Sequence, residues 1–292
     1  MESYISESSM AVWNGVTLII SVVSLFIWLS GMRKGWIPSQ SRVHAWEVTW
    51  TRFFLLLWLV FALAMILPFA LWDILGFYGS ESPGDAFRLW ETFFLNVGMQ
   101  VAMIAVLVCC AYFTREWFPG VLSGIQGLER NRRWMRTTIL RFFQFLPLVL
   151  LASLAVNLAY EKLGIVIEPQ EVIILMMRID DPLLWVVAVF STVVFAPLAE
   201  ELVFRGVVYR FLKSRFRPEL AVIVSAALFS VIHIELSVLL PLFVLGIVLA
   251  LVYEETGDIR APILFHGIFN LQTMGLILLD RFVLNAGSSL LP

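Results

Sequence analysis

Long apolar runs alternate with short polar segments along most of the chain. Each run approaches the length of about 20 residues that a helix needs to cross a bilayer. The candidate spans are residues 11–30, 53–73, 92–113, 142–160, 183–204, 219–236, 238–253 and 261–279. Only Ser237 and its neighbours separate the sixth span from the seventh. The pattern predicts an all-α, polytopic membrane protein with about eight transmembrane helices.

Composition agrees with this prediction and says little about partners. Hydrophobic residues make up 60% of the chain and charged residues 14%, with a mean hydropathy of +0.90. In soluble domains about 45–50% of the residues are hydrophobic and about 25% are charged. The adjacent cysteines Cys109 and Cys110 lie in an apolar run and are interpreted as packing residues. The first ten residues hold two acids and no base, so we expect 11–30 to be an uncleaved helix.

Basic residues gather in alternate connecting segments. With the N-terminus outside, the inside segments are 31–52, 114–141, 205–218 and 254–260, and they hold 16 of the 20 Lys and Arg residues. The positive-inside rule therefore predicts this orientation. Compact loops and the lack of a eukaryotic targeting signal favour a prokaryotic cell membrane.

Segment 114–141 interleaves arginines with aromatic and aliphatic residues. This is typical of an amphipathic helix at a membrane surface, although a solvated loop that obeys the charge rule is the alternative. Nucleic-acid binding is not favoured, because these arginines lie at the membrane. We expect an N-terminal transmembrane region of three helices at 1–141 and a C-terminal helical core at 142–292.

The fifth span carries the string Glu200-Glu201-x-x-x-Arg205. Ionisable groups in a membrane are costly and usually pair, line a cavity or do chemistry. Glu201 and Arg205 share a helix face in the favourable acid-first order. Glu200 points about 100° away and has no obvious local partner, which suits a general base or acid. An ion-paired helix end is the structural alternative.

Two further strings hold two of the three histidines, Phe229-x-x-x-His233 and His266-x-x-x-Asn270. In an antiparallel hairpin that turns at 214–218, Glu200 and His233 lie at matching depth. His266 and Asn270 share a face, and both side chains can donate hydrogen bonds to a developing oxyanion. Alternatively, His233 is a satisfied core residue, and His266 and Asn270 only hold helices together.

These strings in this order, with the stretch 241–271, resemble the CAAX-processing and bacteriocin-processing (CPBP, or Abi) family of intramembrane endopeptidases, over roughly 183–275. The resemblance implies a glutamate-type protease with a cavity open to the cytosolic side. Glu200 and His233 would activate a water, and His266 and Asn270 would stabilise the oxyanion. Glu201 and Arg205 would orient the site, and Phe229 of the second string would be a further supporting residue. It also implies a membrane-associated protein or peptide as substrate.

Two other functions stay open at this stage. The glutamates and histidines are acceptable zinc or iron ligands, so a metal-dependent protease is possible, although we expect no cofactor. The second alternative is a non-enzymatic membrane protein, either an immunity or scaffold factor or a transporter with a central polar cluster. No serine or cysteine stands in a recognisable nucleophile motif, and His-Glu-x-x-His is absent.

Overall fold

The computed structural model describes residues 43–75, 85–113, 133–165 and 181–279, together with Ile19, Val23 and Phe26. Every regular element in these residues is a helix, which confirms the all-α class. Apart from those three residues, the predicted first span at 11–30 lies outside the described residues. Residues 114–132 of the basic segment also lie outside them, and the end of that segment forms the first turns of α4.

Six of the described helices are long and apolar enough to cross a membrane. One of them runs without interruption over Pro182–Lys213 and is called the long helix below. It consists of α6 (Pro182–Phe190), η2 (Ser191–Phe195), α7 (Ala196–Glu201), η3 (Leu202–Tyr209) and α8 (Arg210–Lys213). The others are α2 (Trp50–Ile74), α3 (Asp85–Phe113), α4 (Arg133–Leu163), α10 (Leu236–Thr256) and α11 (Arg260–Leu279).

The seventh described helix, α9 (Pro218–Val231), is shorter than the expected span at 219–236. At a rise of about 1.5 Å per residue its length is about 21 Å, less than the roughly 30 Å of a hydrocarbon core. Pro218 occupies its first turn, where a missing N–H costs nothing. The chain therefore turns back into α10 within the thickness of the bundle, and His233 lies in this turn.

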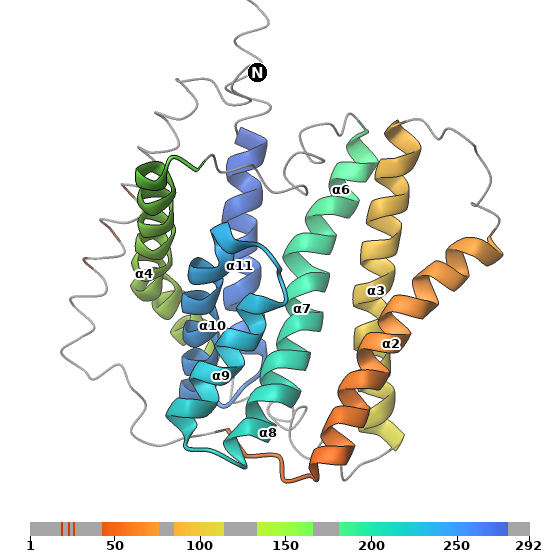
Figure 1. The fold of residues 1–292 in the computed structure, drawn as a ribbon, viewed down its shortest axis with the longest axis horizontal. Helices are drawn as coiled ribbons and strands as arrows, with labels where there is room; N and C mark the ends of the chain where they lie inside the picture. Colours follow the sequence, from red (N-terminus) through yellow and green to blue (C-terminus); the bar gives the residue numbers. More distant parts are fainter. Residues whose placement is uncertain are drawn as a thin grey trace, which may run out of the picture.

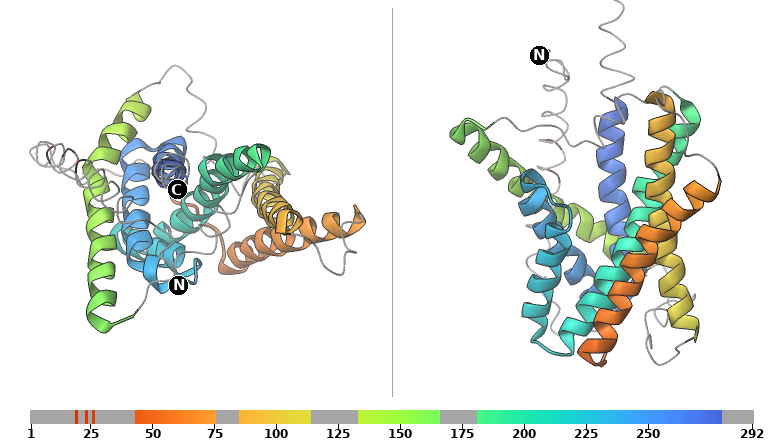
Figure 2. Two further views of the ribbon diagram at one scale, coloured as in Figure 1. Left: turned by 90° about the horizontal axis from the view of Figure 1, so that it is seen from above. Right: turned by 45° about the vertical axis from the view of Figure 1, so that its right-hand side comes forward.

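The helices form an elongated bundle with the long helix near its middle (Figures 1 and 2). α10 packs against α4, α9 and α11, and α3 packs between α2 and the long helix. α2 begins, α3 ends and α8 ends on the lower side of the view in Figure 1. Which side faces the cytoplasm stays a prediction.

The chain before α2 is tied to the end of the long helix. The Trp46 N–H donates to the Arg210 carbonyl at 3.0 Å, and Arg210 Nε donates to the His44 carbonyl at 2.8 Å. Phe53 of α2 stacks on Phe211 with ring centroids 3.8 Å apart. These contacts fix the lower end of the long helix against the start of α2.

Two stretches of the long helix, η2 and η3, are π-helical and flank the two glutamates. π-Helical turns have one extra residue and are frequent at functional sites. Pro197 explains the first of them, because proline has no N–H and its ring opposes a regular turn. All of η3 is buried, including Arg205.

Candidate active site

A buried ion pair holds the second glutamate in place. Arg205 NH1 donates to Glu201 Oε1 at 3.0 Å, and both side chains are 0% exposed. The same guanidinium donates from NH2 to the Gly246 carbonyl at 3.0 Å. Gly246 allows this because a side chain there would collide with Ala226 Cα at 2.9 Å, so α9 and α10 approach closely. A charge this deep is tolerated because it is paired.

His266 lies between the two glutamates. Its Nδ1 is 3.1 Å from Glu201 Oε1, and its Nε2 is 3.9 Å from Glu200 Oε2. An ionised carboxylate can only accept, so Nδ1 carries the proton of this hydrogen bond. In the neutral ring, Nε2 then offers a lone pair to the space beside Glu200. The 3.9 Å separation is longer than a hydrogen bond.

Phe229 is the apolar centre of the site. Its ring meets the rings of His233 and His266 edge to face, with centroids 5.2 Å and 5.8 Å away. The Arg205 guanidinium lies 4.7 Å from the ring centroid, which is a cation–π contact. The fully buried Phe229 thus places both histidines and the arginine around one ring.

His233 follows the last turn of α9 and is exposed. Its Nδ1 is 2.9 Å from the Phe229 carbonyl. Because a carbonyl only accepts, this nitrogen carries a proton, and in the neutral ring Nε2 is the free acceptor. The next residue, Ile234, has φ +55°, which is rare for a β-branched residue.

Asn270 is engaged by the backbone of the long helix. Its Nδ2 donates to the Thr192 carbonyl of η2 at 2.8 Å. An amide nitrogen has two N–H groups, so this hydrogen bond occupies one and the second can donate elsewhere. Asn270 is one helical turn along α11 from His266, on the side of the long helix.

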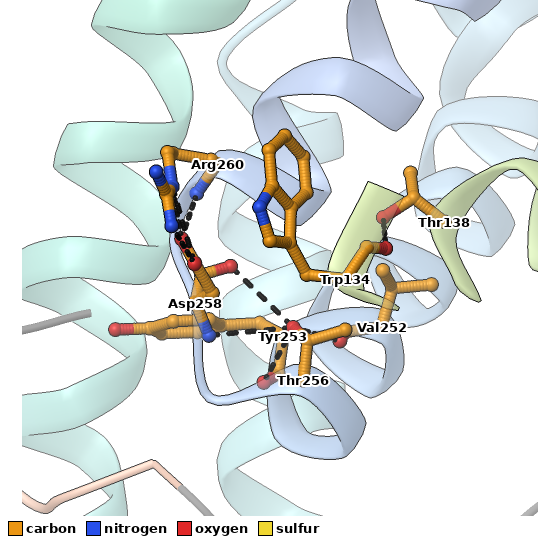
Figure 3. A network of polar contacts seen from close by, with 7 residues as sticks. All are labelled: Trp134, Thr138, Val252, Tyr253, Thr256, Asp258 and Arg260. Atoms are coloured by element: carbon orange, nitrogen blue, oxygen red, sulfur yellow. Dashed lines mark hydrogen bonds and ion pairs between the residues drawn. The ribbon is translucent and has the colours of Figure 1, made fainter. Parts of the chain in front are cut away.

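The turn between α10 and α11 sets where α11 begins (Figure 3). α10 ends at Gly257, whose φ of +69° is the left-handed conformation that glycine adopts most easily. Asp258 Oδ1 accepts from the Arg260 N–H at 3.0 Å, and the Arg260 side chain pairs with the same carboxylate at 2.6 Å. Arg260 also lies 5.0 Å from the centroid of the Trp134 ring of α4. This network fixes the N-terminal end of α11, two turns before His266.

The site combines an accessible carboxylate with a sequestered one. The Glu200 side chain is 25% exposed, and its Oε2 has no hydrogen-bond partner. Glu201 keeps Oε2 unpartnered too, but it is fully buried. An unsatisfied carboxylate oxygen in a low-dielectric site is costly unless a water or substrate group reaches it. Glu200 is the glutamate that such a group can reach.

Through contacts with Phe229 and His266, the structure thus brings together six of the seven predicted site residues: Glu200, Glu201, Arg205, Phe229, His233 and His266. Asn270 lies on the same helix as His266 but contacts Thr192. In the part of the chain that the structure describes, no three His, Cys, Asp or Glu residues are grouped to hold a metal ion.

Sequence reasoning missed the backbone partners, Gly246 and Thr192. Neither carbonyl has a signature of its own in the sequence. Pro197, three residues before Glu200, was the one available signal that the helix would not be regular there.

Part of the chain matches a known protein family. The bundle of membrane-length helices, with its cluster of glutamates and histidines, defines a polytopic helical membrane protein with a polar site. Residues 182–272 match the family model described as Rce1-like, type II CAAX prenyl endopeptidase Rce1-like. This segment therefore carries an Rce1-like domain, and the family resemblance predicted from the three strings is confirmed. Neither a curated protein nor a solved structure matches the chain.

The matched segment contains every residue of the site. It begins at the first residue of α6 and ends two residues after Asn270. The family is one of CAAX-type endopeptidases, so the match supports a protease that acts on a protein or peptide at the membrane. α2, α3 and α4 lie outside the match.

Proposed function

We propose that the protein is a glutamate-type intramembrane endopeptidase that hydrolyses a peptide bond with an activated water. The observation that carries this proposal is the arrangement around Glu200. The Glu200 side chain is 25% exposed, and its buried Oε2, which has no hydrogen-bond partner, stands 3.9 Å from His266 Nε2, inside a helix of membrane length.

Glu200 acts as the general base together with His233. The carboxylate takes a proton from the water as the water oxygen attacks the carbonyl carbon of the scissile peptide. The proton then passes to the leaving nitrogen, the C–N bond breaks, and a carboxylate and an amine leave. Proton transfer of this kind contributes about 10²–10⁴-fold to a rate. No covalent intermediate is needed.

His266 and Asn270 stabilise the oxyanion of the tetrahedral intermediate. Because Nδ1 of His266 is engaged by Glu201, a donor at Nε2 requires the doubly protonated ring. Asn270 contributes the N–H that Thr192 does not use. One such donor is worth about 10²–10³-fold in kcat.

Glu201 and Arg205 position the histidine and do not touch substrate. Arg205 is held by Gly246 and by the Phe229 ring, and it holds Glu201, which in turn fixes His266 Nδ1. This series of contacts sets the orientation and the tautomer of the His266 ring. Both side chains are fully buried, as expected for supporting residues.

The substrate class follows from where the site lies. Glu200 is 14 positions before the hairpin turn begins at Ser214 and therefore deep in the long helix. We propose a membrane-associated protein or peptide as substrate, in a prokaryotic cell membrane with the site open towards the cytoplasm and with no resident metal.

The experiment that tests this proposal is cleavage of a peptide library delivered in liposomes. Wild type, Glu200→Gln and His233→Ala are compared with and without a chelator. Glu255→Gln is the matched control, because Glu255 pairs with Arg141 outside the site. We expect both site variants to lose at least about 10²-fold in rate, and the control and the chelated wild type to stay active. Equal cleavage by all variants would contradict the catalytic roles of Glu200 and His233, and no cleavage by any of them, wild type included, would leave the immunity or scaffold function ahead. Loss with chelator would indicate a metal enzyme.

A further inference from the structure

Three consecutive residues of η2 are each engaged by a neighbouring helix. The Ser191 hydroxyl donates to Gln100 Oε1 of α3 at 3.1 Å. The Thr192 carbonyl accepts from Asn270 of α11 at 2.8 Å. The Val193 carbonyl lies where α11 comes closest, since a Cβ on Gly267 would be only 2.9 Å from it. η2 is therefore a docking element for two helices, and α11 uses the backbone of two successive residues.

Pro197 explains why these carbonyls are available. In a regular helix the Val193 carbonyl would accept from residue 197, and in a π turn the Thr192 carbonyl would do so. Proline has no N–H to give to either. The other regular donor for Thr192 is the Ala196 N–H, which instead donates to the Ser191 carbonyl. Asn270 therefore satisfies an acceptor that the helix itself leaves open.

Gly267 completes the fit between α11 and the long helix. A larger residue there would meet backbone, which cannot swing aside as a side chain can. Gly267 lies between His266, which reaches Glu201, and Asn270, which reaches Thr192. The depth and rotation of α11 are thus set at three neighbouring positions against one helix.

Helix α3 holds the other side of the same turn. Gln100 Nε2 donates to Asn96 Oδ1 at 2.7 Å, which leaves Gln100 Oε1 to accept from Ser191. Gln100 and Ser191 are buried, 9% and 3% exposed. α3 lies outside the matched segment 182–272, so a helix that the family match does not cover supports the π turn.

We infer that Pro197 is a positioning residue of the site, because it opens the backbone carbonyl that holds Asn270 and seats α11. This inference rests on the proposed function insofar as Asn270 is an oxyanion donor. The docking itself, a hydrogen bond from α11 to a carbonyl freed by proline, is independent of that role. Gly267, Gln100 and Ser191 act with Pro197 through the same turn.

The experiment is a double-mutant cycle on the full-length protein in detergent. Pro197→Ala restores an N–H that can compete with Asn270 for the Thr192 carbonyl, and it is combined with Asn270→Ala. A second variant has lactic acid in place of residue 197, so that an ester replaces the amide and the N–H is again missing. Pro147→Ala is the control, because Pro147 lies inside α4, away from the site. Unfolding midpoints and the kcat and KM of peptide cleavage are measured for each.

We expect Pro197→Ala to lower kcat by about 10- to 100-fold, because small misplacements have effects of this size, with less than a twofold change in KM. In the Asn270→Ala background it should cause little further loss in kcat or Tm. The ester variant should keep kcat within about threefold of wild type. Should Pro197→Ala fail to fold, a folded and active ester variant still supports the inference, because the two differ only in the N–H.

If the effects of Pro197→Ala and Asn270→Ala were additive in both kcat and Tm, the inference would be overturned. An ester variant as impaired as Pro197→Ala would overturn it too. A different result separates the two proposals. If Asn270→Ala cleaves normally but its Tm effect is still coupled to Pro197→Ala, the docking is correct and the oxyanion role of Asn270 is wrong.

Discussion

Two membrane helices that contain a proline are each approached closely by a glycine of a neighbouring helix, with different consequences. In α2, Pro68 packs against Gly98 of α3, where a Cβ would lie 2.9 Å from Pro68 Cβ, and the helix stays α-helical throughout. In the long helix, Pro197 follows a π turn, and Gly267 of α11 approaches a backbone carbonyl. The first contact is apolar and joins two helices. The second exposes polar backbone, which a helix with site residues then uses.

This difference matches where the charges are. The side of α3 that meets Pro68 contributes a glycine, whereas the helices around Pro197 carry a buried ion pair and a buried histidine. Polar groups in hydrocarbon need partners. A helix distortion is therefore useful where polar side chains have to be anchored, and a close apolar contact suffices elsewhere.

The largest stability effect is expected for the buried ion pair, which has no counterpart beside Pro68. Arg205→Met leaves the Glu201 carboxylate unpaired, and breaking such a pair costs about 3–5 kcal/mol. The free energy of unfolding in detergent measures this cost. Arg215→Met is the control, since Arg215 is exposed and lies over the Phe211 ring. This variant should lower the free energy of unfolding by less than about 1 kcal/mol. A fall in stability as small as that of the control would contradict the proposed support of Glu201.

The two glycines test the comparison directly. Gly98→Ala and Gly267→Ala both introduce a methyl group into a tight contact, and overpacking of this kind costs about 1–3 kcal/mol. Gly98→Ala should lower the unfolding midpoint and leave the cleavage rate per folded molecule unchanged. Gly267→Ala should lower both, because it displaces α11. A similar loss of rate in both variants would show that the two proline contacts are equivalent.

The smallest effect is expected for the hydrogen bond between α3 and the π turn. Gln100→Leu removes the partner of the Ser191 hydroxyl, and such bonds in membranes average about 0.6 kcal/mol. We expect a small fall in midpoint and a loss of rate no greater than a few fold. Thr138→Val in α4 is the control, because its hydroxyl binds a carbonyl of its own helix. If Gln100→Leu raised the unfolding midpoint, α3 would not support the π turn.

Much of the site could be predicted from the sequence because its residues are rare in apolar runs. Charged and imidazole side chains in hydrocarbon are costly, so Glu200, Glu201, Arg205, His233 and His266 stood out by type and spacing. Local periodicity also fixed which of them share a helix face. Spans were predicted from hydropathy alone, and this located six of the long helices.

The features that could not be predicted depend on the backbone and on packing between distant helices. Hydropathy does not show that α9 ends at Val231, because the following residues Ile232 and Ile234 are apolar too. The helices that contact the π turn η2, α3 and α11, are distant from it in the sequence, and Asn270 finds its partner in a carbonyl 78 positions away. A side chain can be identified from the sequence, whereas a free carbonyl is visible only in the fold.

The most direct test of the central claim compares the two adjacent glutamates. Glu200→Gln and Glu201→Gln are assayed for single-turnover peptide cleavage in liposomes and for unfolding in detergent. We predict that Glu200→Gln folds as stably as wild type and loses at least about 10²-fold in rate. Glu201→Gln should lower the unfolding midpoint, because it weakens the buried contacts to Arg205 and His266. Cleavage by Glu200→Gln at the wild-type rate would contradict the assignment of Glu200 as the base.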